Sequence, residues 1–476
     1  MNKLTKGILA GLAVIPMAGI MTACDGGETI NLKDATIELS YTQVAYDGNA
    51  KCPEVTITYQ GEVIDKDEYV VSYDQNINAG TAYAIIRAAR DSEELVGNIT
   101  LNFTITKSNA YVDTYLELVN SLSNNNYKAV ILEEDITIPY GATLSVASNK
   151  TLDLASYALA NHGTIHNSGT ILTTQNFGSN GTVVNEGDIV ASVSTVEGML
   201  DAFEYSNYIK LAQNISKEDG YLGDIRLVTK HDYDFTLDLN GYNLESEFDI
   251  FKYEKVGNVY NHYPHSVVDI TITDTSIART GSLGSAESDY GLYVRGNDHY
   301  NINIVNAKLQ GLWGGLYTNG SADTANTVIT AINSRFEGLA EDGFGAYVGS
   351  NFVYNFTNCE FSGVSGYYAK SGRHTFNNCS FYADGEFLPG PYNGDGAHNT
   401  GCAINVDSCK GYTEVLSVEI NGGFIRSENG YGIYEFSTAK AGESKITYGS
   451  VSVRGLVTYA THLGNIQSEN NAVSVQ

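Results

Sequence analysis

The side chains best placed for acid–base chemistry flank a recurring Gly-x-Tyr tripeptide in the second half of the chain. Arg295, Lys370 and Arg373 follow copies of this tripeptide, and Asp342 precedes one. Basic groups and an acid on neighbouring repeats could move a proton on a bound substrate, which makes these four residues the weak catalytic candidates. Solvated charges at strand ends are the competing interpretation.

A second candidate site is the segment 382–400, which interrupts the repeats and holds Asp384, Glu386, Asp395 and His398. Loops on a rigid scaffold often carry binding residues. Oxygen ligands would suit Ca²⁺, but the spacing matches no calcium motif, so no cofactor is predicted and a purely structural loop is the alternative. The cysteines form no CxxC and no His-paired spacing, so no metal site is predicted either.

The aromatic residues offer a third candidate, a flat surface for stacking sugar rings. Trp313 is the only tryptophan, and Tyr317, Tyr347 and Tyr367 lie near it in the repeat pattern. Aromatic rings combine a large apolar face with a polar edge, which suits such a role. Packing in a core is the competing interpretation of the same four residues.

These candidates depend on repeats that must position them. Asn306, Asn333, Asn358 and Asn378 recur at steps of 27, 25 and 20 residues, each followed by a small residue and then a large apolar one. Such a pattern predicts stacked coils about 4.8 Å apart, with the amides forming a ladder inside the wall. Asn421 fits this column only with a one-residue slip. Cys359 and Cys379 fill equivalent slots one coil apart, where a disulfide or two buried thiols would fit.

An earlier segment repeats a shorter phrase and is led by a helix. Asn167 and Asn185 begin two copies of the phrase, 18 residues apart, which is about one small coil. The segments 114–117 and 194–197 each fit a capping box that opens an amphipathic helix. Each helix is followed by strands and a matched landmark, Leu-Asp-Leu at 152–154 and Leu-Asp-Leu-Asn-Gly at 237–241. A helix of this kind can cover the open end of stacked coils.

The repeats resemble the right-handed parallel β-helices of the pectate-lyase-like superfamily over about 109–476. The resemblance implies an all-β fold, with a first β-helical segment and its cap helix at 109–192 and the main β-helix at 193–476. Proteins of this superfamily include polysaccharide lyases, glycoside hydrolases and pectin methylesterases. The Asn-Thr-Asp, Asp-Asp, Gly-His-Gly and Arg-Ile-Lys signatures of the hydrolases are absent from the chain.

Residues 29–107 contain short alternating strands separated by turn signals, which predicts a small β-sandwich. The unit resembles the Ig-like repeats of surface proteins from Gram-positive bacteria, in which such a module is usually a spacer. Before it, residues 1–23 have the charged start and short apolar run of a signal peptide. Residues 21–24 resemble a lipobox, which implies that Cys24 carries lipid and that 24–28 is a tether. An ordinary signal peptide with a chance cysteine is the alternative.

Composition narrows the function. The chain has 34 Tyr and 49 Gly but only 17% charged residues, which favours an exported all-β protein. A formal charge of −28 argues against nucleic acid as a partner, and against an anionic polysaccharide unless cations mediate the contact. We therefore expect a lipid-anchored, outward-facing surface protein that binds or adheres to glycans or to host or cell-envelope ligands without catalysis. A surface-anchored polysaccharide lyase or glycoside hydrolase is the alternative, so enzymatic activity is left open. A structural protein of the cell envelope without a soluble ligand is a third possibility.

Overall fold

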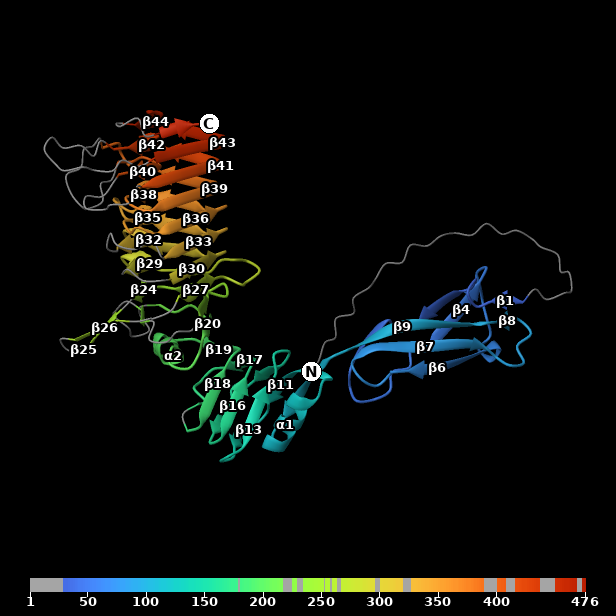
Figure 1. Ribbon diagram of the computed structural model, residues 1–476. Coiled ribbons are helices and arrows are strands. Elements are labelled where there is room, and N and C mark those ends of the chain that lie inside the picture. The colour runs from blue at the N-terminus through green and yellow to red at the C-terminus, as the bar shows by residue number, and fades with distance from the viewer. Residues whose placement is uncertain are drawn as a thin grey trace. The chain divides into compact units, whose positions relative to one another are not determined.

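The computed structural model describes residues 29–178, 180–216, 225–228, 234–251, 253–256, 259–262, 267–295, 300–319, 327–388, 400–407, 416–436, 450–468 and 473–476 (Figure 1). The chain divides into two compact units, residues 1–108 and 109–476. The predicted signal peptide and Cys24 lie outside the described residues. Within the described part, none of the helices has the length and apolar character needed to cross a membrane.

The first unit consists of three small sheets around its own core. The sheets are β2 (Thr36–Leu39), β4 (Val55–Tyr59) and β5 (Glu62–Val63); β3 (Gln43–Ala45), β9 (Asn98–Thr106), β7 (Gly80–Ala88) and β6 (Tyr69–Asp74); and β1 (Ile30–Asn31) with β8 (Leu95–Val96). Alternate residues such as Val55, Ile57, Ala84 and Ile86 are buried in one cluster, because successive side chains of a strand face opposite sides. A short 3-10 helix, η1 (Lys66–Glu68), precedes β6.

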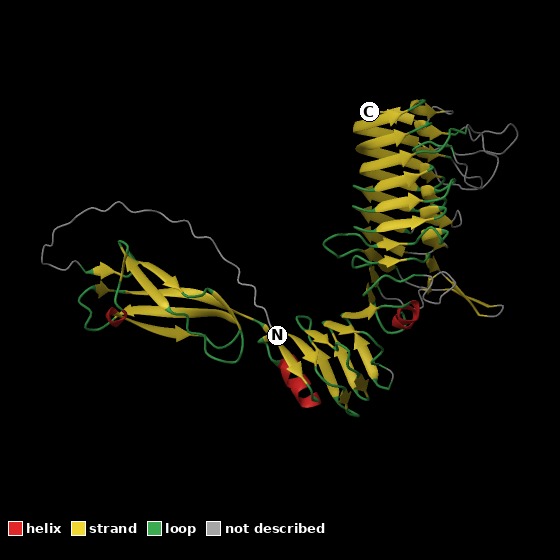
Figure 2. Cartoon of the chain, turned by 180° about the vertical axis from the view of Figure 1, so that it is seen from behind, coloured by secondary structure: helices red, strands yellow, loops and turns green. Residues whose placement is uncertain are grey.

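The second unit is built on one long sheet of twenty strands, with parallel pairing between successive turns of the chain (Figure 2). Its strands are, in order, β10 (Ser108–Val112), β11 (Tyr127–Leu132), β14 (Thr151–Asp153), β17 (Thr170–Thr173), β19 (Asp188–Val193), β20 (Tyr208–Leu211), β22 (Phe235–Asp238), β23 (Asn243–Leu244), β27 (Val268–Thr273), β28 (Ser282–Leu283), β30 (Tyr300–Val305), β31 (Lys308–Gly311), β33 (Val328–Ile332), β34 (Arg335–Gly338), β36 (Val353–Thr357), β37 (Glu360–Gly363), β39 (Arg373–Ala383), β41 (Ser417–Ser427), β43 (Ser450–Thr461) and β45 (Val473–Val475).

A second parallel sheet faces the long sheet in the later part of this unit. Its nine strands are β21 (Ile225–Val228), β24 (Phe248–Phe251), β29 (Tyr290–Arg295), β32 (Gly314–Asn319), β35 (Phe344–Val348), β38 (Ser365–Ala369), β40 (Ile404–Val406), β42 (Tyr431–Glu435) and β44 (Gly464–Ser468). The chain visits the long sheet and then the nine-stranded sheet in every turn, an arrangement compatible with a parallel β-helix. We call one such turn a coil. An antiparallel hairpin, β25 (Tyr253–Val256) and β26 (Val259–His262), leaves this regular pattern.

Before residue 193 the coils contribute to the same long sheet, but other sheets take the place of the nine-stranded sheet. Two small parallel sheets complete these early coils, β12 (Ile136–Ile138) with β15 (Leu159–Asn161), and β13 (Thr143–Val146), β16 (Thr164–Asn167) and β18 (Thr182–Asn185). Helix α1 (Tyr115–Ser123) buries Leu118 and Leu122 against the first coil. The N-cap half of the predicted capping box is present, because Thr114 is the N-cap and its hydroxyl accepts a hydrogen bond from the Glu117 amide at 3.3 Å. The Glu117 carboxylate accepts from the Asp113 amide at 3.3 Å.

The second helix differs from its prediction in start and position. Helix α2 (Val196–Ala202) begins one residue later than expected, with Thr195 as the N-cap accepting from the Gly198 amide at 3.0 Å. It also does not cover an open end. Strands β19 and β20, on either side of α2, pair directly in parallel. The long sheet is therefore continuous through the two segments that the sequence separates at residue 193.

The predicted asparagine ladder is present, but on the outside of the turns. The amides of Asn333, Asn358 and Asn378 each donate to the preceding member of the column, at 3.3, 3.2 and 2.9 Å, starting from Asn306. All four residues have φ between 52° and 57°. This left-handed conformation turns the chain sharply between two strands of the long sheet and directs the amides outward. The expectation of a ladder inside the wall was wrong. Gly422, with φ of 69°, takes the next position, consistent with the slip at Asn421.

The Gly-x-Tyr column marks a close approach between coils. A Cβ on Gly345 would lie 2.4 Å from the Gly366 carbonyl oxygen, and one on Gly315 would lie 2.7 Å from the Glu337 amide nitrogen, each in the next coil. Only glycine fits there, because the neighbouring atoms are backbone. Cys359 and Cys379 are buried on adjacent strands as free thiols, so of the two predicted alternatives the structure has the thiols.

Candidate functional site

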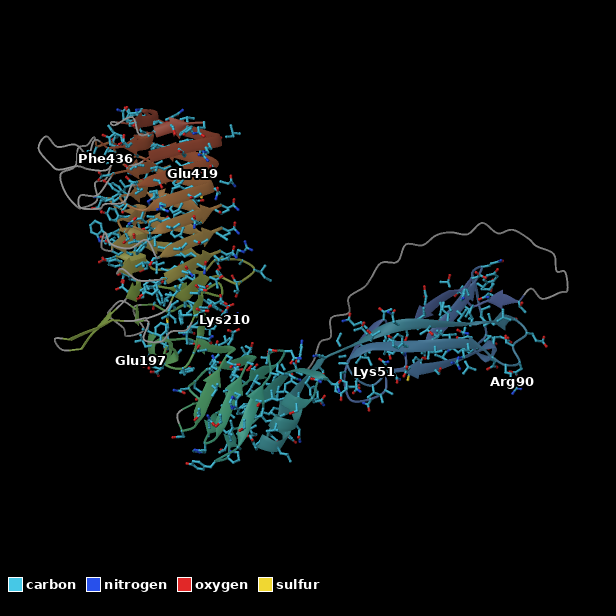
Figure 3. The ribbon with its side chains drawn as sticks, in the orientation of Figure 1. Lys51, Arg90, Glu197, Lys210, Glu419 and Phe436 are labelled. Carbon is cyan, nitrogen blue, oxygen red and sulfur yellow. The ribbon has the colours of Figure 1, made fainter. Side chains whose placement is uncertain are left out.

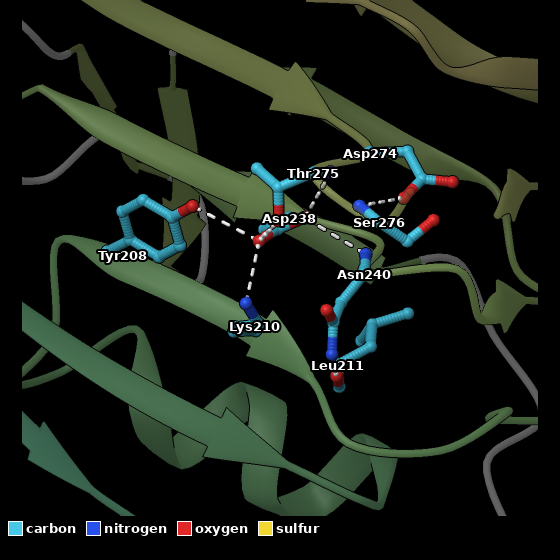
Figure 4. Close-up of polar contacts among 8 residues, drawn as sticks. All are labelled: Tyr208, Lys210, Leu211, Asp238, Asn240, Asp274, Thr275 and Ser276. Atoms are coloured by element: carbon cyan, nitrogen blue, oxygen red, sulfur yellow. Dashed lines mark hydrogen bonds and ion pairs between the residues drawn. The ribbon is translucent and has the colours of Figure 1, made fainter. Parts of the chain in front are cut away.

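A buried carboxylate organises the outer surface of the long sheet next to α2 (Figure 4). Asp238 is fully buried at the end of β22. Its Oδ1 accepts from the amides of Asn240 and Thr275, at 2.9 and 3.0 Å. Its Oδ2 accepts from the hydroxyls of Thr275 and Tyr208, at 2.6 and 3.1 Å, and lies 3.5 Å from the Lys210 Nζ. Three successive coils are thus tied to one side chain, and we call this group the Asp238 clip.

The clip explains the Leu-Asp-Leu landmarks. Asp153 holds the equivalent position in an early coil and accepts from the Ala155 amide at 2.8 Å, as Asp238 does from Asn240. Ala155 and Asn240 both have φ of 50°. The aspartate therefore stabilises a tight turn at the end of a strand. Asp238 can accept about four hydrogen bonds and already accepts four, so both of its oxygens are occupied by donors of the protein itself.

A cleft of about 530 Å³ lies beside the clip, on the outer face of β14, β17, β19 and β20; we call it the outer cleft. Leu172 and Val190 form its half-buried floor, next to the Tyr208 ring, since register aligns these three residues on adjacent strands. Asp153, Ser192 and Lys210 provide polar groups around the floor. Figure 3 labels Lys210 on this part of the sheet and Glu197 on α2. Burial, together with the nearby Asp238 charge, raises the pKa of Tyr208, so its hydroxyl is a lasting donor.

A second cleft, of about 630 Å³, opens where the small sheet of the early coils ends at β18; we call it the β18 cleft. Phe177, Val183 and Tyr205 give it an apolar part. Asn and acidic side chains surround this part, namely Asn176, Asn185, Asn207, Glu186, Glu204 and Asp234. Ile189 lines this cleft while its neighbour Val190 lines the outer cleft, so the two clefts lie on opposite faces of the same wall.

The structure does not gather the predicted catalytic residues into one site. Asp342 precedes β35, whereas Lys370 follows β38 and donates its amide to the Val348 carbonyl. About seven residues of extended chain separate these levels, roughly 20 Å. Arg373 is exposed at the start of β39, in the other sheet. Arg295 ends β29, and its side chain lies outside the described part.

Lys370 also differs from the solvated charge that the sequence suggested. Its side chain is almost fully buried, with Nζ 3.5 Å from the Asp407 Oδ2 and 5.9 Å from the centre of the Tyr368 ring. Tyr368 donates to the same carboxylate oxygen at 3.0 Å. The ion pair therefore joins two neighbouring coils. The sequence gave no sign of it, because Asp407 follows 37 residues later with no repeat signature.

The predicted aromatic platform is not a flat exposed surface. Tyr317 stacks between Tyr290 and Tyr347, with ring centres 4.2 and 5.1 Å away, so both of its faces are covered. Tyr367 is fully buried in the core, where its hydroxyl lies 2.8 Å from His374 Nδ1. The outward place in that coil belongs to Tyr368. Trp313 is 40% exposed but lies four residues before Tyr317, about 13 Å along an extended strand.

The segment 382–400 is described only in part. Asp384 and Glu386 are exposed, whereas Asp395 and His398 lie outside the described residues. Among the residues that are described, no group of three or more His, Cys, Asp or Glu side chains could hold a metal ion. The calcium alternative therefore has no support from the described end of this loop.

The sequence patterns predicted neither of the two clefts. Tyr208, Lys210 and Tyr205 belong to no repeat column, and Asp238 stood out only as part of a landmark phrase. The available signal was the break in periodicity around 194–207, where a helix replaces the strand expected of a regular coil. No protein-family model, curated protein or solved structure matches the chain.

Proposed function

We propose that the protein is a lipid-anchored surface protein that binds glycans or other envelope or host ligands without transforming them. In this proposal Cys24 carries the lipid and the first unit is an Ig-like spacer. The second unit is a right-handed parallel β-helix of the pectate-lyase-like kind that presents the ligand site outward. The net charge of −28 favours ligands that are not polyanions.

The outer cleft provides the main support for this proposal. Its floor combines Leu172, Val190 and the Tyr208 ring, and such amphipathic surfaces suit the apolar face of a sugar. The surrounding Asp153, Ser192 and Lys210 can exchange hydrogen bonds with sugar hydroxyls. Its volume of about 530 Å³ lies in the range typical of ligand sites. Its lining strands are regular and paired on both sides, which gives a preorganised surface.

The alternative, a polysaccharide lyase or glycoside hydrolase, requires more than this cleft offers. Glycoside hydrolysis commonly uses two carboxyl groups, one as acid and one as base or nucleophile. In the described part of the chain, Asp153 is the only carboxylate that lines the outer cleft. The nearby Asp238 is saturated by its four donors, and Lys210 lies against it. The acid–base pair needed for turnover is therefore not available from these residues.

A glycan array, followed by assays for reducing sugar and unsaturated products, tests the proposal. Val190→Glu places a charge on the cleft floor and should weaken binding of any array hit by at least about tenfold. Thr330→Glu is the matched control, because Thr330 occupies the same outward column several coils away and should leave binding unchanged. Product release that is lost in Asp342→Asn or Arg373→Gln would overturn the non-catalytic proposal. Equal binding by both glutamate variants would exclude the outer cleft.

A further inference from the structure

The small sheet of the early coils ends at β18 with one edge directed into the β18 cleft. The order β13-β16-β18 has no further described strand beyond β18, since α2 follows in the coil where the next strand would stand. The edge residues Val183 and Asn185 line the cleft. An open strand edge presents backbone donors and acceptors in a fixed row, ready to pair with another strand.

The hydrogen bonds of β18 identify which backbone groups point into the cleft. The amides of Thr182 and Glu186 donate toward the preceding coil, to the carbonyls of Gly163 and Asn167. In a parallel pair, alternate residues of a strand direct both backbone groups to the same neighbour. Val183 and Asn185 therefore direct their N–H and C=O groups to the opposite side, toward the cleft.

The adjoining residues show how the protein satisfies such an edge where no strand follows. The Asn207 side chain accepts from the Ile189 amide at 2.8 Å and donates to the Gly187 carbonyl at 3.2 Å. The Ser206 hydroxyl donates to the Ile189 carbonyl at 2.6 Å. Directly after β18, side chains thus make the hydrogen bonds that a neighbouring strand would otherwise make. The cleft begins where these side-chain hydrogen bonds end.

The remaining lining defines the chemistry of the occupant. Val183 and Tyr205 are half-buried and offer apolar surface on the side toward which Val183 points, next to the buried Phe177. Glu186, at the end of β18, and Glu204 and Asp234 line the same cleft with negative charge. Among the described residues, all those that line the cleft are uncharged or acidic, namely Asn176, Phe177, Gly178, Val183, Asn185, Glu186, Gly187, Ile189, Glu204, Tyr205, Ser206, Asn207 and Asp234. A cationic segment is favoured over an anionic one.

We propose that the β18 edge binds an extended peptide segment of a partner protein by strand addition. The segment pairs with the backbone of Val183 and Asn185, places alternate apolar side chains toward Phe177 and Tyr205, and ends in Lys or Arg beside Glu186. This interaction is independent of glycan binding, because the outer cleft lies on the other face of the wall. Backbone pairing supplies affinity, and the apolar and acidic groups supply specificity.

The test uses the full chain and a synthetic, fluorescently labelled hexapeptide of alternating valine and threonine that ends in two lysines. Fluorescence anisotropy should show saturable binding. Two peptides, each N-methylated at one alternating set of residues, should differ by at least about tenfold, because only one set donates to the edge. Equal affinity of the two N-methylated peptides would overturn strand addition. A peptide ending in two glutamates should bind at least about tenfold more weakly, and equal affinity there would refute charge selection.

The matched protein variants are Val183→Pro and Val183→Ala. Proline removes the edge N–H, which makes no bond to the preceding coil, so β18 should retain its own pairing. Val183→Pro should weaken peptide binding about tenfold relative to Val183→Ala, which keeps the N–H. Hydrogen exchange on the unmodified chain provides a readout independent of folding in the variants. Saturating peptide should slow exchange of the Val183 and Asn185 amides, and unchanged exchange there, or equal protection by a neutral oligosaccharide, would contradict the proposal.

Discussion

The early coils, before α2, and the later coils, after it, are two versions of one construction. Both contribute parallel strands to the same long sheet, and the pairing of β19 with β20 carries that sheet past the helix. The early core is mainly aliphatic, whereas the later core stacks aromatic rings such as Phe336, Phe361 and Phe381. The long sheet is therefore continuous while the remaining sheets of the cross-section differ between early and later coils. The two clefts lie where these remaining sheets change.

The amide ladders show the same contrast at the level of single turns. Asn167 in the early coils is buried, and its Nδ2 donates to Asn185 Oδ1 at 2.7 Å and to the Asp188 carbonyl at 3.1 Å. Asn333, Asn358 and Asn378 in the later coils are exposed, and each donates to the preceding asparagine of the column. A buried amide replaces missing backbone partners, whereas an exposed one competes with water. The same residue type therefore contributes differently on the two sides of α2.

The largest expected effect comes from removing a core side chain on either side. Phe361→Ala should lower the free energy of unfolding by about 3–5 kcal/mol, and Leu152→Ala in the early coils by about 2–5 kcal/mol. Because the long sheet is continuous, both variants should shift the urea transition reported by Trp313, which lies only in the later coils. A Leu152→Ala variant whose Trp313 transition stays in place would show that the two sets of coils unfold independently.

The Asp238 clip comes next. Asp238→Asn replaces an acceptor with a donor in front of the Tyr208 and Thr275 hydroxyls, and should cost about 2–4 kcal/mol. Asp153→Asn is the counterpart in the early coils, where Oδ1 accepts from one amide and the side chain is half-buried, and should cost less than about 1 kcal/mol. Thermal or urea unfolding of both variants measures the difference. Equal costs would mean that the three-coil network adds nothing beyond the turn.

A pH effect is expected from His374 in the later core. Burial lowers the pKa of His374 to about 3, and its Nε2 donates to the Ser371 carbonyl, so Nδ1 accepts from the Tyr367 hydroxyl. The unfolded chain binds a proton near pH 6.5 while the folded chain does not, so stability falls as pH drops below 6.5. Between pH 6.5 and 4.5 the loss from this residue is about 2–3 kcal/mol.

His374→Gln isolates that contribution, because glutamine can accept from Tyr367 and donate to Ser371 without titrating. The unfolding free energy of the wild type, relative to that of the variant, should decrease as pH falls from 6.5 to 4.5. A difference that does not change with pH over this range would mean that His374 titrates normally.

The smallest effects separate the two amide ladders. Asn167→Ala should cost about 2 kcal/mol, since it leaves the buried Gly169 amide without its acceptor. Asn358→Gly keeps a residue that tolerates φ of 53° and removes only the exposed amide, so it should cost less than about 1 kcal/mol. Chemical denaturation provides both values. A larger cost for Asn358→Gly would reverse the assignment of the stabilising ladder.

Repeating residues made much of the fold predictable. The columns of Asn306 and its counterparts gave the register of the later coils, and the step from Asn167 to Asn185 gave that of the early ones. The direction of individual side chains was harder to predict. Tyr367 and Tyr368 are both consistent with the column, and only packing decides which of them faces the core. The clefts were beyond reach, since they arise where α2 interrupts the pattern and where Asp238 meets Tyr208 and Thr275 from other coils.

The most direct test of the account is a hydrogen-exchange footprint of a glycan selected on the array. We expect slower exchange in β14, β17, β19 and β20, around the outer cleft, and an unchanged mass for the recovered glycan. The Thr330→Glu variant should give the same footprint, whereas Val190→Glu should give weaker protection at the same glycan concentration. Protection centred on the stacked tyrosines of the later coils, or a cleaved glycan, would contradict non-catalytic binding at the outer cleft.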